Sequence, residues 1–103
     1  MLEKNKDWIL HSVIFSLKHE RGSERERQFL EDGERILSSI ESVSEFQVLR
    51  QVSVKNEYDF GFSMEFANQA DYEAYNTHPL HVSFVKERWE TEVERFLEID
   101  YKK

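Results

Sequence analysis

Two histidines and a tyrosine lie close together around the chain's only proline. The segment reads Asn76-Thr77-His78-Pro79-Leu80-His81-Val82, and Tyr75 directly precedes it. A proline disfavours helical backbone at the residue before it and suits the first turn of a new helix, so His78-Pro79 marks a break. The spacing therefore predicts a helix–helix corner that brings Tyr75 and His81 together. An imidazole that titrates near neutral pH can act there as a general base.

Each of these residues also has a structural interpretation. His81 can hydrogen-bond a backbone carbonyl and hold the corner, Tyr75 can pack at the end of its helix, and His78 is expected to cap the next one. His11 alternates with apolar residues on a predicted strand, where a lone histidine is usually a satisfied core residue. The four histidines lack metal-site spacing, and no phosphate loop, nucleophile elbow or dinucleotide fingerprint is present. We therefore predict no metal and no cofactor.

The composition limits the class of protein. The 103 residues include eight Phe, four Tyr and two Trp, which is too aromatic for a disordered chain and sufficient for one core. A net charge of −7 argues against nucleic acids and anionic membranes as partners, since both select basic patches. The chain has no cysteine, no signal peptide pattern and no apolar run of membrane length. We expect a single cytoplasmic domain spanning residues 1–103.

Hydrophobic periodicity predicts an α+β protein. Apolar and polar residues alternate over the four segments expected to be strands, 8–18, 45–55, 58–66 and 93–101. Helices are expected from Ser23 to about Ile40, from Asn68 to Tyr75, and from Pro79 onward, with Ser23 and Glu26 forming a capping box. The order is the βαββαβ pattern of the ferredoxin-like fold, with one antiparallel sheet and its helices on a single face.

The two faces of this sheet are predicted to differ. One is aromatic and meets the helices, as shown by the alternation of Tyr58, Phe60, Phe62, Met64 and Phe66. The opposite face mixes polar residues with large apolar ones, namely Trp8, Leu10, Ile14, Leu49 and Phe96. Because such a face is seldom left in water, we expect it to pack against a second copy in a homodimer.

Several motifs together resemble the stress-responsive A/B barrel domain family. They are His11-Ser12-Val13-Ile14-Phe15, Lys55-Asn56 with Tyr58-Asp59-Phe60, Asp71-Tyr72-Glu73-Ala74-Tyr75 running into His78-Pro79-Leu80-His81-Val82, and Glu98-Ile99-Asp100-Tyr101. The resemblance covers about residues 10–101. It implies a dimeric α+β barrel in which two ferredoxin-like sheets pack face to face.

The resemblance also implies a pocket. One family member is a plant polyketide cyclase; His81 matches its catalytic histidine, Tyr75 the partner tyrosine, and His11 a further pocket histidine. The apolar residues expected to contact a ligand are Phe15, Phe29, Phe62, Val82 and Trp89. The pattern departs at Gly33, where the cyclase has a tyrosine, so we expect a wider or differently shaped cavity.

Three functions fit these observations. We expect a homodimer that binds a small apolar or aromatic ligand between sheet and helices, because aromatic walls with few polar groups are typical of such pockets. The first alternative is a cofactor-free enzyme, polyketide-cyclase-like or monooxygenase-like, that uses His81 and Tyr75. The second is a structural, stress-protective dimer whose aromatic residues only fill the core. The sequence names no substrate.

Overall fold

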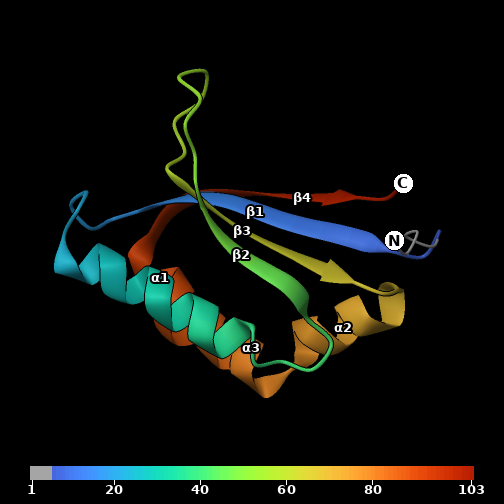
Figure 1. Cartoon of the computed structure of the whole chain (residues 1–103). Helices are drawn as coiled ribbons and strands as arrows, with labels where there is room; N and C mark the ends of the chain where they lie inside the picture. Colours follow the sequence, from blue (N-terminus) through green and yellow to red (C-terminus); the bar gives the residue numbers. More distant parts are fainter. Residues whose placement is uncertain (1–5) are drawn as a thin grey trace.

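The computed structural model describes residues 6–103, and its helices all lie against one face of a single sheet (Figure 1). In chain order the elements are β1 (Ile9–Leu17), α1 (Glu24–Leu37), β2 (Ser44–Arg50), β3 (Phe60–Phe66), α2 (Gln69–Thr77), α3 (Pro79–Phe84), a π-helical turn η1 (Val85–Trp89), α4 (Glu90–Glu92) and β4 (Val93–Tyr101). The four strands are antiparallel in the order β2-β3-β1-β4. This is the predicted ferredoxin-like fold.

Three helices begin where the sequence predicts, because a side chain caps each first turn. Ser23 Oγ, Asn68 Oδ1 and His78 Nδ1 accept backbone N–H groups at 3.2, 2.8 and 3.1 Å, at the starts of α1, α2 and α3. Helix α1 ends at Leu37, and the chain continues to Ile40 through bonds that reach three residues back. No helix within residues 6–103 is long and apolar enough to cross a membrane.

The second and third strands are shorter than predicted. The prediction of a strand over 45–55 is wrong beyond Arg50, and β3 begins at Phe60 rather than Tyr58. The intervening loop projects from the sheet on the side away from the helices (Figure 1). Two residues expected to alternate on the strand are instead almost fully exposed in this loop, Val52 and Val54.

Local hydrogen bonds explain the loop. The Ser53 hydroxyl accepts the Lys55 N–H at 3.1 Å, and the Asn56 side chain accepts the Tyr58 N–H at 2.9 Å. Such side-chain-to-backbone bonds compete with the pairing of strands. The segment with Val52 and Val54, whose alternation predicted a strand, therefore has no neighbouring strand with which to form backbone hydrogen bonds.

The pairing of β4 with β1 inverts the predicted faces of the last strand. Phe96 pairs with Phe15 and faces the helices, so its assignment to the opposite face is wrong. The register shifts between Ser16 and Leu17, where β4 has one extra residue. The extra residue brings Phe96 onto the same face as Val93, whereas strict alternation places them apart. The residues after Phe96 that turn away from the helices are Leu97, Ile99 and Tyr101.

The side of the sheet without helices is consequently more apolar than predicted. We call it the open sheet face and define it by Leu10, Ile14, Leu49, Leu97, Ile99 and Tyr101. Leu49, Gly61, Ile14 and Leu97 are neighbours in register, so one row crosses all four strands. Leu49, Leu97 and Tyr101 are exposed large apolar side chains.

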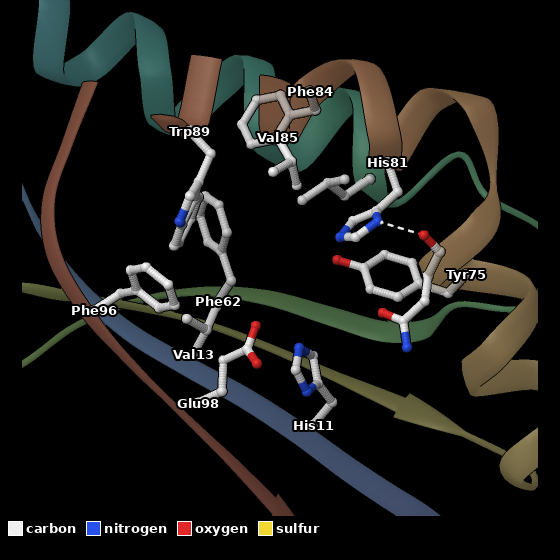
Figure 2. A pocket seen from close by; sticks show the side chains of 12 residues that line it. His11, Val13, Phe62, Tyr75, His81, Phe84, Val85, Trp89, Phe96 and Glu98 are labelled. Atoms are coloured by element: carbon white, nitrogen blue, oxygen red, sulfur yellow. Dashed lines mark hydrogen bonds between the residues drawn. The ribbon is translucent and has the colours of Figure 1, made fainter. Parts of the chain in front are cut away.

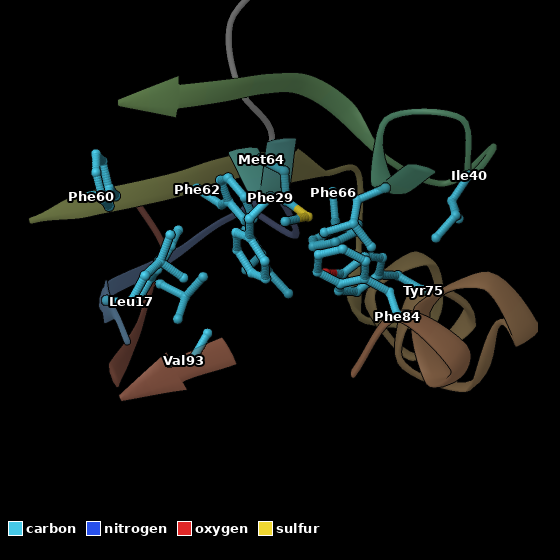
Figure 3. Packing of buried hydrophobic residues seen from close by; sticks show 14 residues of the cluster. Leu17, Phe29, Ile40, Phe60, Phe62, Met64, Phe66, Tyr75, Phe84 and Val93 are labelled. Atoms are coloured by element: carbon cyan, nitrogen blue, oxygen red, sulfur yellow. The ribbon is translucent and has the colours of Figure 1, made fainter. Parts of the chain in front are cut away.

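The core between sheet and helices is built mainly of aromatic rings (Figure 3). Phe15 is fully buried, and its ring centroid lies 4.8 Å from that of Phe62 and 4.9 Å from that of Trp89. A Cβ atom on Gly33 would lie 2.7 Å from Phe62 Cζ and 3.3 Å from Phe84 Cζ. These two rings therefore occupy the space beside Gly33, which a larger residue would need.

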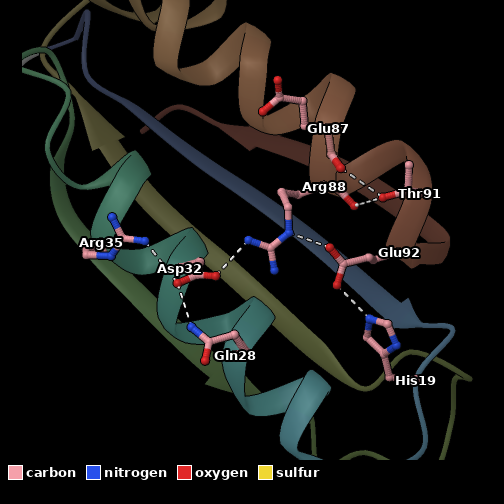
Figure 4. A network of polar contacts seen from close by, with 8 residues as sticks. All are labelled: His19, Gln28, Asp32, Arg35, Glu87, Arg88, Thr91 and Glu92. Carbon is pink, nitrogen blue, oxygen red and sulfur yellow. Dashed lines mark hydrogen bonds and ion pairs between the residues drawn. The ribbon is translucent and has the colours of Figure 1, made fainter.

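A chain of charged groups connects α1, η1, α4 and the end of β1 (Figure 4). Arg88 donates to Asp32 at 2.7 Å and to Glu92 at 2.5 Å, and Glu92 also contacts His19 at 2.6 Å. The Arg88 hydrogen bond holds the pKa of Asp32 below its ordinary 3.8. Burial would raise the pKa of Glu92, but hydrogen bonds from Arg88 and His19 lower it below its ordinary 4.5.

We predict that this network stabilises the fold above about pH 4.5 and that its contribution disappears as the pH falls, because both carboxyl pKa values are lower in the folded chain. Arg88→Met should lower the free energy of unfolding at pH 7 by about 1–3 kcal/mol. It should also weaken the loss of stability as the pH falls below about 4.5. Urea unfolding at fixed protein concentration measures both effects.

Arg27→Met is the matched control, because Arg27 pairs with two exposed carboxylates on the surface of α1. Such pairs contribute about 0–1 kcal/mol. Equal losses of stability in the two variants would contradict the role of the network.

Candidate functional site

A partly open cavity of about 210 Å³ lies between the helix side of the sheet and α3–η1 (Figure 2). Most of its wall is apolar, formed by Val13, Leu37, Phe62, Phe84, Val85, Trp89 and Phe96. The polar residues of the wall are His11, Tyr75, Asn76, His81 and Glu98. Strands β1, β3 and β4 therefore contribute to the same cavity as the helices above them.

The structure brings together five of the residues predicted for the pocket: His11, Phe62, Tyr75, His81 and Trp89. The other three lie elsewhere. Phe15 and Phe29 are fully buried in the core and do not line the cavity. Val82 is exposed on α3 and lines a more open groove, which shares Asn76, His81 and Val85 with the cavity.

His81 uses one ring nitrogen to hold the helix corner and leaves the other for the cavity. Its Nδ1 lies 3.1 Å from the carbonyl oxygen of Asn76, which can only accept, so Nδ1 carries the proton. The second nitrogen, Nε2, carries a lone pair and faces the cavity (Figure 2). Burial lowers the pKa of His81 below its ordinary 6.5. The imidazole is therefore neutral at pH 7 and can accept a proton or a hydrogen bond.

Tyr75 lies beside His81 and directs its hydroxyl into the same space (Figure 2). The two ring centroids are 4.3 Å apart, and only 3% of Tyr75 is exposed. Burial raises the pKa of its hydroxyl far above the ordinary 10, so the group remains a donor. Within residues 6–103 this hydroxyl has no hydrogen-bond partner, which leaves it available to a ligand.

His11 lies on the sheet below Tyr75 and is held by two residues outside the cavity. The Asp100 carboxylate lies 2.5 Å from His11 Nδ1, and the Tyr72 hydroxyl donates to the other Asp100 oxygen at 2.9 Å. Because the carboxylate accepts, Nδ1 carries the proton and Nε2 is left toward the cavity (Figure 2). Two imidazoles thus present Nε2 to one cavity from opposite walls.

The π-helical turn η1 forms another part of the wall. Val85 and Trp89, at its two ends and four residues apart, both line the cavity. Turns of this kind are rare and occur frequently at functional sites. No set of three or more His, Cys, Asp or Glu residues in the described part of the chain is placed to hold a metal ion.

A comparison with family models places residues 9–103 in one family, described as the stress responsive A/B barrel domain. The chain belongs to the stress responsive A/B barrel domain (Dabb) family. Among solved structures, a Dabb family protein with a ferredoxin-like fold from Mesorhizobium loti is 56% identical, with a TM-score of 0.94 over 94% of this chain and 97% of that chain. No curated protein matches the chain.

More distant structures share the fold of this Dabb protein. A dimeric protein of unknown function from Bacteroides fragilis is 22% identical, with a TM-score of 0.70 over 93% of this chain and 96% of that chain. The hydroxynitrile lyase of Passiflora edulis is 14% identical, with a TM-score of 0.82 over 96% of this chain and 95% of that chain. At these identities the likeness shows the fold alone.

The sequence pattern missed the residues that β4 contributes to the Dabb cavity. Phe96, Glu98 and Asp100 share the face toward the helices, and Glu98 pairs with Val13. The alternating apolar residues of this strand suggested the opposite assignment. The available signal in the sequence was the spacing of Glu98, which lies two residues from both Phe96 and Asp100. This spacing indicates a shared site only when the register of β4 is known.

We predict that the pKa of His81, followed by NMR of its ring, lies below 6.5 and is lowered further by Glu98→Gln, because the Glu98 charge raises it. Folding then favours the neutral ring, so His81 contributes a loss of stability as the pH falls through its folded pKa. The same NMR titration of the chain unfolded in urea gives the pKa of His81 in the unfolded state as the reference. A folded pKa at or above that reference would contradict the buried position of His81.

Proposed function

We propose that this Dabb protein binds a small apolar or aromatic ligand in the cavity beside His81. The observation that carries the proposal is an apolar cavity whose polar groups have no partner within the described chain, chiefly the Tyr75 hydroxyl and His81 Nε2. A few polar groups in an apolar wall are typical of ligand sites. Since an apolar cavity of about 150 Å³ admits benzene, a volume of about 210 Å³ suits one substituted ring.

The unpartnered hydroxyl also argues against a purely structural protein. Its oxygen is not among the fully buried, unsatisfied side-chain atoms of the described chain, so it opens onto the cavity, where a hydroxyl adds nothing to the packing of the ring. A core selected only for stability would place phenylalanine at Tyr75, where the ring already packs against Phe66 and His81. A ligand that accepts from the hydroxyl would account for it.

We expect indole to bind in this cavity and to shift the amide NMR signals of residues around His81. Val85→Phe fills the cavity from η1 and should abolish those shifts. Val54→Phe makes the same change in the loop between β2 and β3, at a side chain outside the cavity that is 97% exposed, and should leave binding unchanged. Melting temperatures of both variants verify that they fold.

Equal binding by wild type and Val85→Phe would place the ligand elsewhere. Absence of any shift with indole, and with the smaller probe benzene, would contradict a ligand-accessible cavity.

Acid–base catalysis is a second candidate, favoured by the neutral imidazole of His81 next to the protonated hydroxyl of Tyr75. A base and a hydrogen-bond donor side by side can remove a proton next to a carbonyl group and stabilise the oxygen. The hydroxynitrile lyase with this fold indicates that the scaffold can carry catalysis. The NMR titration of His81 tests this candidate, because an imidazole still charged at neutral pH has no lone pair to accept a proton.

We further propose that two copies pack through the open sheet face and form a dimeric α+β barrel. The apolar row from Leu49 to Leu97 supports this, since water disfavours a continuous apolar surface. Solved structures of the same fold from Bacteroides fragilis and Thermobifida fusca are described as dimeric. A two-fold dimer would use the same face on both copies.

Light scattering at micromolar concentration should give the mass of two chains for the wild type and of one chain for Leu97→Glu. Leu80→Glu is the matched control, because Leu80 lies on α3 and is 42% exposed, against 47% for Leu97. A monomeric wild type, or a dimer that survives Leu97→Glu and a second variant, Leu49→Glu, would contradict this interface.

A further inference from the structure

We propose that the cavity takes a protonated amine carried on a small apolar or aromatic body, with the Glu98 carboxylate as its counter-ion. This assignment rests on the proposed ligand-binding function and names the class of ligand. It follows from the charge, the aromatic rings and the hydrogen-bonding groups that surround the cavity.

Glu98, an exposed residue of β4, adds a negative charge to the mostly apolar wall of the cavity. It faces the helices because it pairs with Val13, and its carboxylate turns into the cavity rather than away from it (Figure 2). In the part of the chain that the structure describes, this carboxylate forms no ion pair or hydrogen bond. A cation entering the cavity would therefore find a carboxylate without a competing partner.

Aromatic rings line the same cavity as that carboxylate. Phe96 precedes it on the same face of β4, and the Phe96 ring meets Trp89 edge-on with centroids 5.6 Å apart. Phe62 and Tyr75 line the same cavity. Aromatic faces attract ammonium groups through their negative quadrupole, so rings and a carboxylate together are suited to an amine.

The other charged groups do not offset Glu98. None of the described residues that line the cavity is a lysine or an arginine. His81 is neutral at pH 7, and His11 directs its Nδ1 to Asp100 rather than into the cavity. A carboxylate ligand would be repelled by Glu98, whereas the net charge of −7 attracts cations toward the protein.

The arrangement of hydrogen-bonding groups agrees with this choice. His81 Nε2 and His11 Nε2 are acceptors, and an ammonium group brings only donors. The hydroxyl of the buried Tyr75, which has no hydrogen-bond partner within residues 6–103, remains for an acceptor atom on the ligand body. An inward charge on β4 can also block pairing at a sheet edge, but that role requires no aromatic cavity around it.

The test uses three probes of one size that differ in charge: 2-phenylethylamine, which is protonated at pH 7, 2-phenylethanol and phenylacetate. Isothermal titration calorimetry on the full chain should give about tenfold tighter binding for the amine than for the alcohol, and no measurable binding of phenylacetate. Glu98→Gln keeps the shape of the side chain and should reduce the affinity for the amine to that for the alcohol.

Glu94→Gln is the control, because Glu94 lies on the same strand and outside the cavity. It should leave the affinities for all three probes unchanged. Alcohol or phenylacetate binding as tightly as the amine, or an amine affinity unaffected by Glu98→Gln, would overturn the cationic ligand while leaving the cavity in place. Failure of all three probes would overturn the ligand-binding function itself.

Discussion

The pairing of β4 with β1 is the constraint on which both the cavity and the open sheet face depend. One extra residue on β4, opposite the step from Ser16 to Leu17, decides which side chains of the last strand face the helices. With this register, Phe96 and Glu98 form a wall of the cavity, and Leu97 joins the open sheet face. Shifting the pairing by one residue would exchange the two sets, because strand side chains alternate between faces.

The helix corner at Pro79 provides the opposite wall. Proline ends one helix and starts the next, and the His78 cap and the His81 bond to Asn76 hold the two together. Because the hydrogen bond to Asn76 uses Nδ1 of His81, it also directs Nε2 of the same ring toward the cavity. The structural and the chemical interpretations of His81 are thus compatible, since each uses a different nitrogen of the same ring.

Local sequence rules predict the fold and one wall of the cavity but not the other. Caps, the proline break and strict alternation on β1 depend on neighbouring residues, so Ser23 and His78 could be assigned from the sequence. A bulge has no such residue signature, and the faces of β4 were therefore inverted. The length of a strand also depends on whether a neighbouring strand is there to pair with it. The sequence near Val54 does not show that such a strand is absent. The crowding of Phe62 against Gly33 is likewise a contact between distant segments.

Ligand binding by this protein requires an accessible apolar space between the Pro79 corner and the face of β4 that is turned toward the helices. A crystal structure determined under xenon pressure tests this most directly, because xenon occupies apolar cavities. We predict xenon density bordered by Phe62, Trp89 and Phe96, with the Glu98 carboxylate turned toward it. Absence of xenon there, with Phe96 and Glu98 on the open sheet face, would contradict both the register of β4 and the site built on it.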